Sequence, residues 1–222
     1  MDRIIDLSTP IRNHFRWPVE RSLRGDFERG DVFQVTHLSW AVHGFTHMDS
    51  PRHMVPGGPT TSDIPLEATV GEAAVLDLTD VEPNEALDGA RLAARAGHLR
   101  DGDIVLFKTG WGERRSLDTP EFWTEAPYIT RDGAEWLLTR RPRAVGFDFP
   151  QDYTIRLLLH KEMRPIEEHV THDVLLRNGV VLIEYLVNTV ALDAERVWFC
   201  CLPLKVEGAD GAPVRAIAMP RP

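Results

Sequence analysis

The segment VHGFTHMDSPRH (residues 42–53) places three histidines and one aspartate close together in the chain, at His43, His47, Asp49 and His53. The whole sequence of 222 residues has nine histidines, so a third of them lie in this window. Neutral imidazoles and a carboxylate are ligands that borderline divalent cations prefer, above all Zn²⁺. We therefore predict that this segment forms part of a metal site.

The backbone of this segment is expected to be extended and bent. A helix is disfavoured because Gly44 and Pro51 weaken it, and proline inside a helix costs about 3 kcal/mol. In an extended chain the odd-numbered side chains share one side. A straight strand would separate His43 from His53 by about 33 Å, at a rise of about 3.3 Å per residue. The chain must therefore bend, at Gly44 and Pro51, before these side chains can surround one cation.

A second candidate ligand is Glu184, which interrupts the apolar run VVLIEYL at residues 180–186. Such a continuous apolar run is typical of a strand that is buried on both faces. A carboxylate in a buried strand is costly unless it is paired or bound to a cation. Glu184 is therefore a candidate metal ligand, with a salt bridge to an arginine as the alternative.

A third candidate ligand is His172, which precedes Glu184 by twelve residues. We expect it at the start of a short helix that Thr171 caps and that ends at Asn178-Gly179. At that place the imidazole can point outward past the first helical turn. His160 and His169 are alternatives for the same role.

The composition limits the classes of function. Apolar residues make up 43% and charged residues 27% of the chain, as in soluble globular proteins. The net charge of −9 and the lack of a dense basic block argue against a nucleic-acid partner. No apolar run approaches the roughly 18–20 residues of a membrane span, and the start MDRIIDLSTP has no signal-peptide pattern. The adjacent Cys200 and Cys201 indicate no disulfide scaffold, so we expect a cytoplasmic protein.

The order of predicted elements indicates the fold class. Strands are expected at residues 3–8, 32–42, 73–79, 103–110, 143–149 and 180–186, and in a closing hairpin that turns at 208–211. Helices are expected at residues 88–98, 130–140 and 171–178, the second capped by Thr130. Residues 9–31 are polar and predicted to be a long loop or lid. Strands alternate with helices and no linker divides the chain, so we expect one α/β or mixed α+β domain over residues 1–222.

The pattern H-x-x-x-H-x-D-x-P-x-H resembles that of the cyclase family of metal-dependent hydrolases, which includes bacterial kynurenine formamidases and isatin hydrolases. The opening IIDLSTPI, the pair Trp17-Pro18, the spacing from His172 to Glu184 and the ending PLKVEGADGAPVRAIA are also similar to the family. The resemblance therefore runs over almost the whole chain. It implies a swivelling β/β/α-type fold and a homo-oligomer, either a dimer or a tetramer.

The resemblance also assigns roles to individual residues. It implies five metal ligands, namely His43, His47, Asp49, His172 and Glu184. Asp49 and Glu184 would bridge two metals, so one or two ions would bind per chain, Zn²⁺ first and Mn²⁺ as the alternative. His53 would be the general acid/base, with metal ligation as its alternative role. Trp17 would line the substrate pocket, and Phe45, which replaces the usual glycine before Thr-His, would alter the pocket wall.

Together these residues predict a metal-dependent amidohydrolase that takes a small-molecule amide or lactam. The first hypothesis is that it cleaves the C–N bond of an aryl formamide such as N-formylkynurenine, a reaction of tryptophan catabolism. A metal-bound hydroxide would attack the carbonyl, and His53 would protonate the leaving nitrogen. The second hypothesis is a hydrolase of a cyclic amide or lactone, similar to isatin hydrolase. The third is a metal-binding protein without turnover, in which protein atoms fill every coordination position.

Overall fold

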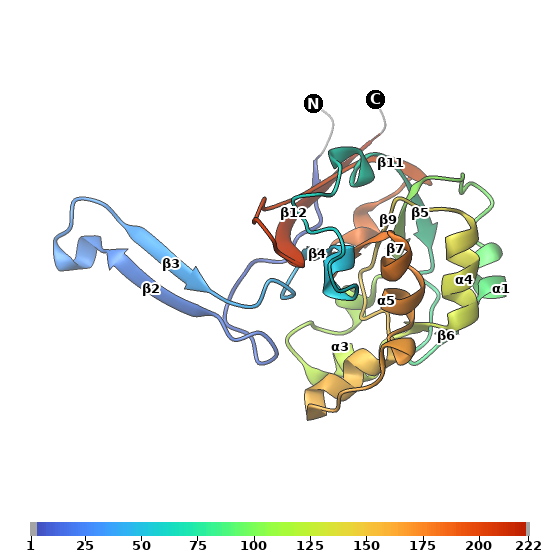
Figure 1. Cartoon of the computed structure of the whole chain (residues 1–222), viewed down its shortest axis with the longest axis horizontal. Coiled ribbons are helices and arrows are strands. Elements are labelled where there is room, and N and C mark those ends of the chain that lie inside the picture. Colours follow the sequence, from blue (N-terminus) through green and yellow to red (C-terminus); the bar gives the residue numbers. More distant parts are fainter. Residues whose placement is uncertain (1–3, 221–222) are drawn as a thin grey trace.

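The computed structural model describes residues 4–220 and is built around one mixed β-sheet. The strands of this sheet are β1 (Ile5–Asp6), β4 (His47–Asp49), β5 (Val70–Asp77), β7 (Ile104–Lys108), β9 (Ala144–Gly146), β10 (Val181–Glu184), β11 (Arg196–Pro203) and β12 (Gly211–Met219). Their order is β1-β12-β11-β5-β7-β9-β10-β4, and β4 pairs with β12 as well as with β10. The sheet therefore closes on itself into a barrel-like core (Figure 1).

The sheet has a parallel half and an antiparallel half. Strands β5, β7, β9 and β10 run parallel, whereas β4, β11 and β12 pair antiparallel. Parallel neighbours need long crossover connections, which here contain most of the helices. The α-helices are α1 (Gly89–Ala93), α2 (Trp111–Arg114), α3 (Pro120–Thr124), α4 (Arg131–Thr139) and α5 (Val170–Val174). Helix α4 packs between α1 and α5 (Figure 1), which confirms the mixed α+β class.

Two apolar clusters hold the layers together. Val181 and Ile183 of β10 belong to a cluster that fills the barrel, whereas Leu182 belongs to the cluster between the sheet and the helices. Successive strand residues face opposite sides, so Glu184 follows Leu182 on the helix-facing side. Its carboxylate therefore emerges at the end of a parallel strand, where the chain leaves the core.

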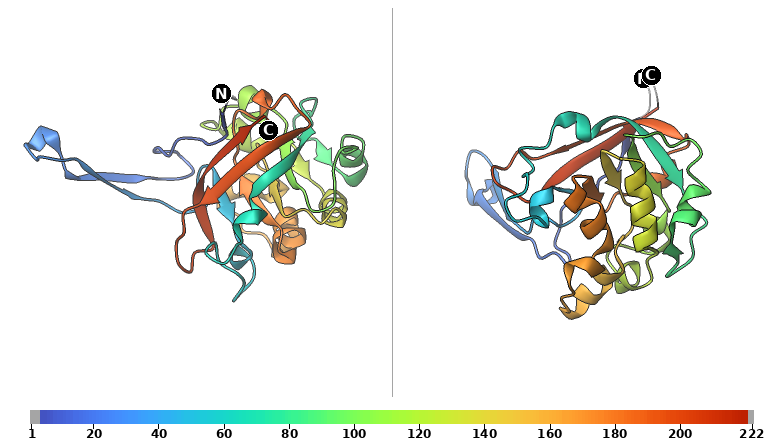
Figure 2. Two further views of the ribbon diagram at one scale, coloured as in Figure 1. Left: turned by 90° about the horizontal axis from the view of Figure 1, so that it is seen from above. Right: turned by 45° about the vertical axis from the view of Figure 1, so that its right-hand side comes forward.

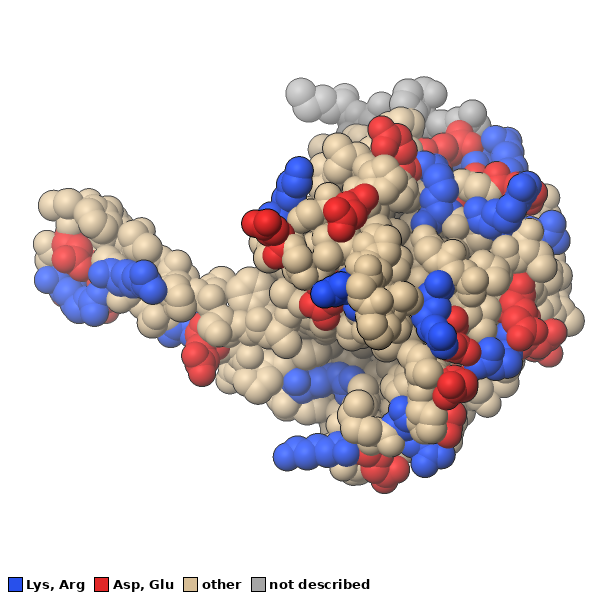
Figure 3. Space-filling model, in the orientation of Figure 1, with Lys and Arg blue, Asp and Glu red and all other residues tan. Residues whose placement is uncertain are grey.

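A long hairpin forms an arm that projects from the barrel (Figures 1 and 2). It consists of β2 (Glu20–Gly25) and β3 (Val35–Ser39), which pair antiparallel. The prediction of a loop over residues 9–31 is therefore wrong for β2, whereas the strand predicted at 32–42 is confirmed in β3. The polar composition of β2 gave no strand signal, because most residues on both strands of this hairpin are exposed. Uncharged residues cover most of the arm in the face drawn in Figure 3.

The short pair β6 (Ala86–Leu87) and β8 (Tyr128–Ile129) completes the strands of the described region. The strands predicted at 103–110, 143–149 and 180–186 are confirmed within their bounds by β7, β9 and β10, whereas β5 begins at Val70, before the predicted range of 73–79. The helix predicted at 88–98 is confirmed only in its first half, as α1. The helix at 130–140 begins as expected, because Thr130 Oγ1 accepts from the Gly133 amide at 3.1 Å. The first strand is confirmed in β1, although Arg3 lies outside the described residues. No helix in residues 4–220 is long and apolar enough to cross a membrane.

The helix before Glu184 differs from the prediction at its start. Helix α5 begins at Val170, so Thr171 lies inside it and does not cap it. The Thr171 amide instead donates to Asp152 Oδ1 at 2.7 Å, a carboxylate from a distant loop that takes over the capping role. The α-helix itself ends at Val174, and a 3-10 turn (Leu176–Asn178) continues to the predicted end, where Gly179 adopts a left-handed conformation with φ of 86°. Distant capping of this kind leaves no local sequence signal.

Candidate metal centre

The segment with the histidine cluster is bent, as predicted. His43 lies in the turn before β4, His47 and Asp49 lie on β4, and His53 ends a short 3-10 helix that begins at Pro51. Strand β4 pairs with β10, and Glu184 is the register partner of His47. The two segments that sequence analysis singled out are therefore neighbours in one sheet.

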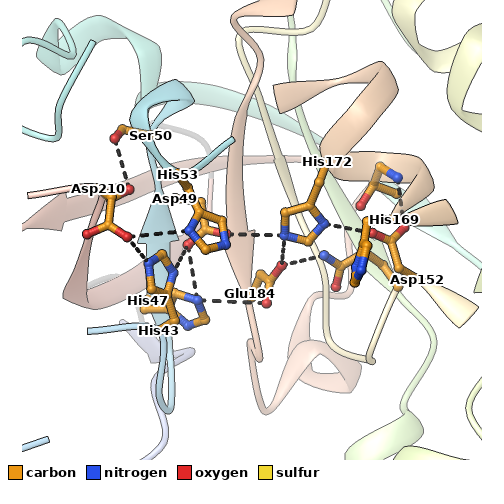
Figure 4. Close-up of polar contacts among 12 residues, drawn as sticks. His43, His47, Asp49, Ser50, His53, Asp152, His169, His172, Glu184 and Asp210 are labelled. Carbon is orange, nitrogen blue, oxygen red and sulfur yellow. Dashed lines mark hydrogen bonds and ion pairs between the residues drawn. The ribbon is translucent and has the colours of Figure 1, made fainter. Parts of the chain in front are cut away.

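The Asp49 carboxylate is the centre of the cluster (Figure 4). Its Oδ1 lies 2.7 Å from His43 Nδ1 and 3.1 Å from His47 Nε2. Its Oδ2 lies 3.5 Å from His172 Nε2. The two oxygens thus face different sets of imidazoles, which is the arrangement that a bridging carboxylate requires.

Glu184 faces the same cluster from β10. Its Oε1 lies 3.4 Å from His172 Nε2, and its Oε2 lies 3.7 Å from His47 Nε2. Gln151 Nε2 also donates to Oε1 and helps to fix the carboxylate. The alternative of a salt bridge between Glu184 and an arginine is not seen in the part of the chain that the structure describes.

The donor set fits a divalent cation. Asp49 and Glu184 are 1% and 4% exposed, and within residues 4–220 neither is paired with a lysine or arginine. Two buried carboxylates are costly unless a positive charge compensates them. The pKa of His43 reflects these negative charges. Burial lowers this pKa, but the carboxylates of Asp49 and Asp210 outweigh burial and raise the pKa to about 9. The cluster around Asp49 and Glu184 therefore favours a bound positive charge, either a proton or a metal ion.

The outward-facing nitrogen of each imidazole in the predicted ligand set has its own acceptor. These acceptors are Asp210 Oδ2 for His43 Nε2 (2.7 Å), the Phe45 carbonyl for His47 Nδ1 (2.8 Å) and Asp152 Oδ2 for His172 Nδ1 (2.7 Å). Metal-binding histidines commonly use such a partner, which fixes the tautomer and the ring orientation. The nitrogens left for a metal are therefore His43 Nδ1, His47 Nε2 and His172 Nε2.

Sequence analysis missed Asp210, which lies in the turn before β12. Its carboxylate contacts both His43 Nε2 at 2.7 Å and His53 Nδ1 at 3.4 Å. Its carbonyl accepts from the amide and the hydroxyl of Ser50, each at 2.9 Å. The next residue, Gly211, leaves room for the His43 ring, since a Cβ there would lie 2.6 Å from His43 Cε1. The sequence analysis identified the ending PLKVEGADGAPVRAIA, which contains Asp210. The pairing of β12 with β4, which brings Asp210 to the cluster, leaves no pattern in the sequence.

His53 lies at the mouth of the cluster. Its ring stacks on His43 with centroids 3.9 Å apart, and it is about one quarter exposed. Burial lowers the pKa of His53, so the ring is neutral at pH 7. A ligand atom of His53 also lies within 4.8 Å of ligand atoms of His43 and Asp49, so metal ligation stays open as its alternative role.

A cavity of about 560 Å³ opens over the cluster. Its floor includes the five predicted metal ligands and His53, and its walls include Met54, Ile155 and Leu158. Trp17, which was expected at the substrate pocket, also lines this cavity and packs against Tyr185 with ring centroids 5.0 Å apart. A reactive amide can therefore approach the polar floor while an aromatic ring packs against an apolar wall.

Phe45 does not line this cavity. It is buried behind Trp17, with ring centroids 5.0 Å apart, and adopts a left-handed φ of 63°. Tyr185, which follows Glu184, has a similar φ of 58°, and its carbonyl accepts from Thr46 Oγ1 at 2.8 Å. Such conformations are uncommon outside glycine and concentrate at functional sites. Phe45 therefore supports Trp17 and holds His47 through its carbonyl.

The alternatives to His172 lie away from the carboxylates. His160 is exposed and does not line the cavity. His169 lines the cavity, but its Nδ1 contacts Thr154 Oγ1 at 3.0 Å and its ring centroid lies 6.2 Å from that of His172. Of these three histidines, His172 contacts the carboxylates of both Asp49 and Glu184.

Comparison with known proteins places the chain among hydrolases. The putative cyclase family model matches residues 5–151. A kynurenine formamidase of Bacillus cereus is 27% identical over 97% of each chain, and one of Salinibacter ruber is 31% identical over 83% of this chain and 79% of its own. A potential metal-dependent hydrolase with cyclase activity is 29% identical, with a TM-score of 0.76 over the full length of both chains. An isatin hydrolase A of Labrenzia aggregata, 21% identical, has the same fold with a TM-score of 0.82 over 98% of this chain and 93% of its own.

Proposed function

The chain belongs to the cyclase family and is a metal-dependent amidohydrolase, and from that premise we propose that it cleaves the C–N bond of an aryl formamide such as N-formylkynurenine. The observation that supports this most is the pair of buried carboxylates, Asp49 and Glu184, among oriented imidazoles at the floor of an open cavity. Two kynurenine formamidases, 27% and 26% identical, match 97% of the chain, which favours a formamide as the substrate.

We propose that the cluster holds divalent metal, Zn²⁺ first and Mn²⁺ as the alternative. His43, His47 and Asp49 would hold one ion, and Asp49, Glu184 and His172 a second. The opposite orientation of the two Asp49 oxygens supports this division. A divalent cation at such a site supplies a Lewis acid and lowers the pKa of bound water.

Side chains around the cavity would carry out proton transfer and substrate binding. His53 has a neutral ring at the cavity, so it would take a proton from the attacking water and return it to the leaving nitrogen. Asp210 contacts His53 Nδ1 and would hold the ring so that Nε2 faces the substrate. Trp17, supported by Phe45, would bind the aromatic ring of the substrate.

A second candidate substrate is a cyclic amide or lactone. The likeness in fold to isatin hydrolases favours this second candidate. The test is hydrolysis by the metal-loaded protein of N-formylkynurenine and of isatin. We expect N-formylkynurenine to have a kcat/KM at least about tenfold higher, since one well-placed group is worth about 1.4 kcal/mol or more. A preference for isatin supports the second candidate, and no hydrolysis of either contradicts both.

We further propose that the chain forms one domain over residues 1–222, of the swivelling β/β/α type, and assembles as a homodimer or tetramer in the cytoplasm. The arm supports the assembly, because its apolar side chains have little to pack against in the same chain. Val32 is 89% exposed, and Phe27 and Phe33 are 63% and 57% exposed. Exposed apolar groups on this scale mark interaction surfaces.

A further inference from the structure

The cavity over the metal cluster also contains a cation, Arg16, which immediately precedes Trp17. We propose that Arg16 binds an anionic group of the substrate, a carboxylate, and so selects amides that carry a negative charge in addition to the scissile bond. This inference rests on the proposed function, because it specifies which amides the same site accepts. It makes Arg16 a specificity-determining residue.

The first observation is that Arg16 lacks an acidic partner. No carboxylate in residues 4–220 lies within 4.0 Å of its guanidinium, and its one polar contact is a long one, from Nη1 to the Ile155 carbonyl at 3.4 Å. A second arginine on the cavity wall, Arg164, is already paired with Glu168 through two contacts of 2.8 and 3.1 Å. Arg16 therefore has donors left for a ligand, whereas Arg164 is neutralised.

The second observation is that the Arg16 guanidinium is held in place. It lies over the Trp123 ring, 4.4 Å from the ring centroid, and the Trp123 side chain is fully buried. This cation–π contact restrains the guanidinium and leaves its N–H groups available as hydrogen-bond donors. A guanidinium can donate two parallel hydrogen bonds to the two oxygens of a carboxylate, and such paired contacts are among the stronger hydrogen bonds in proteins.

The third observation is the distribution of charge in the cavity. The acidic groups that line it, Asp49 and Glu184, belong to the proposed metal ligands, where a bound metal would compensate their charge. The cavity wall also has an apolar part, which includes Ile155 and Leu158. The cavity thus offers a metal cluster for an amide, an apolar wall for a ring and a partly buried cation for an anion. An open-chain aryl amide with a carboxylate satisfies all three, whereas a neutral bicyclic lactam leaves Arg16 without a partner.

Calorimetric binding to the metal-loaded protein tests this inference without turnover. The probes are kynurenine and kynurenine methyl ester, which differ in the carboxylate charge. We expect the wild type to bind the acid on the order of tenfold more tightly than the ester, since hydrogen bonds to charged groups are the stronger kind. Arg16→Met should reduce this preference to about one, and Arg16→Lys should retain part of it.

The matched control is Arg12→Met, in the same segment. Arg12 pairs with Asp118 at 2.6 Å and does not line the cavity, so this variant should keep the wild-type preference. The inference is overturned if the wild type binds acid and ester equally or binds neither, or if Arg16→Met keeps the preference. Hydrolysis of N-formylkynurenine is measured separately, so a protein that binds the acid selectively but cleaves no formamide contradicts the proposed function alone.

Discussion

His47 on β4 and Glu184 on β10 are register partners in neighbouring antiparallel strands, with His47 Nε2 3.7 Å from Glu184 Oε2. A one-residue slip in the pairing would turn Glu184 to the opposite face of the sheet. The metal cluster therefore depends on the register of the barrel as well as on its ligands. The closure of β4 onto β12 adds Asp210 to the same cluster by the same kind of pairing.

Removing the charge of Asp210 should weaken metal binding. Asp210→Asn preserves the shape of the side chain but loses the carboxylate that holds His43 Nε2, and such outer partners are worth about 10- to 100-fold in affinity. The measurement is competition with a metal chelator. Glu207→Gln, an exposed residue of the same turn, is the control and should leave the affinity unchanged. Equal affinities for Asp210→Asn and the wild type would show that His43 is positioned without this carboxylate.

Replacing His53 should separate metal binding from turnover. His53→Ala removes the proposed proton carrier, so kcat should fall by about 100- to 10,000-fold while the metal content stays that of the wild type. His160→Ala, an exposed histidine outside the cavity, should change neither quantity. Loss of metal from the His53 variant would assign His53 as a ligand, and full activity would remove it from the mechanism.

Metal binding should release protons. The carboxylates of Asp49 and Asp210 overcome the effect of burial and raise the pKa of His43 to about 9, so without a competing cation the ring is protonated at neutral pH. A metal ion must displace this proton, and affinity should therefore rise with pH up to about 9. Calorimetric titrations in buffers of different ionisation enthalpy should give about one or more protons released per ion at pH 7. An affinity that is flat over this range would contradict the assignment of His43 as a ligand.

The arm should determine the oligomeric state. Replacing residues 20–39 by a short glycine-serine turn removes the exposed apolar side chains, and the proposed dimer or tetramer should dissociate. Sedimentation velocity measures the change. A milder variant, Phe27→Ser with Phe33→Ser, keeps the hairpin and should weaken association in the same direction. A monomeric wild type would contradict the proposed assembly.

Much of the cluster could be predicted from the sequence, because its signals are local. Four of its residues lie within the short segment 42–53, and Glu184 is a carboxylate in an otherwise apolar strand. Asp152 and Asp210 were missed because each reaches its histidine through the tertiary fold, which leaves no pattern in the local sequence. The cap of α5 was predicted wrongly at Thr171 for the same reason, since Asp152 accepts from its amide.

The barrel strands were predicted because their residues are buried, and burial leaves a continuous or alternating apolar pattern. Strand β2 was missed because it pairs with β3 and all its residues except Gly25 are exposed or half-buried. Its hydrogen bonds do not depend on side-chain type, so the sequence ERSLRG resembles a loop. The closure of the barrel was also outside prediction, because strand order depends on contacts between distant segments.

The most direct test of the central claim is formamide hydrolysis before and after removal of metal. The protein would be stripped with a chelator, dialysed and titrated with Zn²⁺ or Mn²⁺ while hydrolysis of N-formylkynurenine is followed. We predict that the stripped protein has no measurable activity and that activity returns in proportion to the metal bound, to a plateau at one or two ions per chain. Full activity in the stripped, metal-free protein would contradict the claim that His43, His47, Asp49, His172 and Glu184 form a catalytic metal centre.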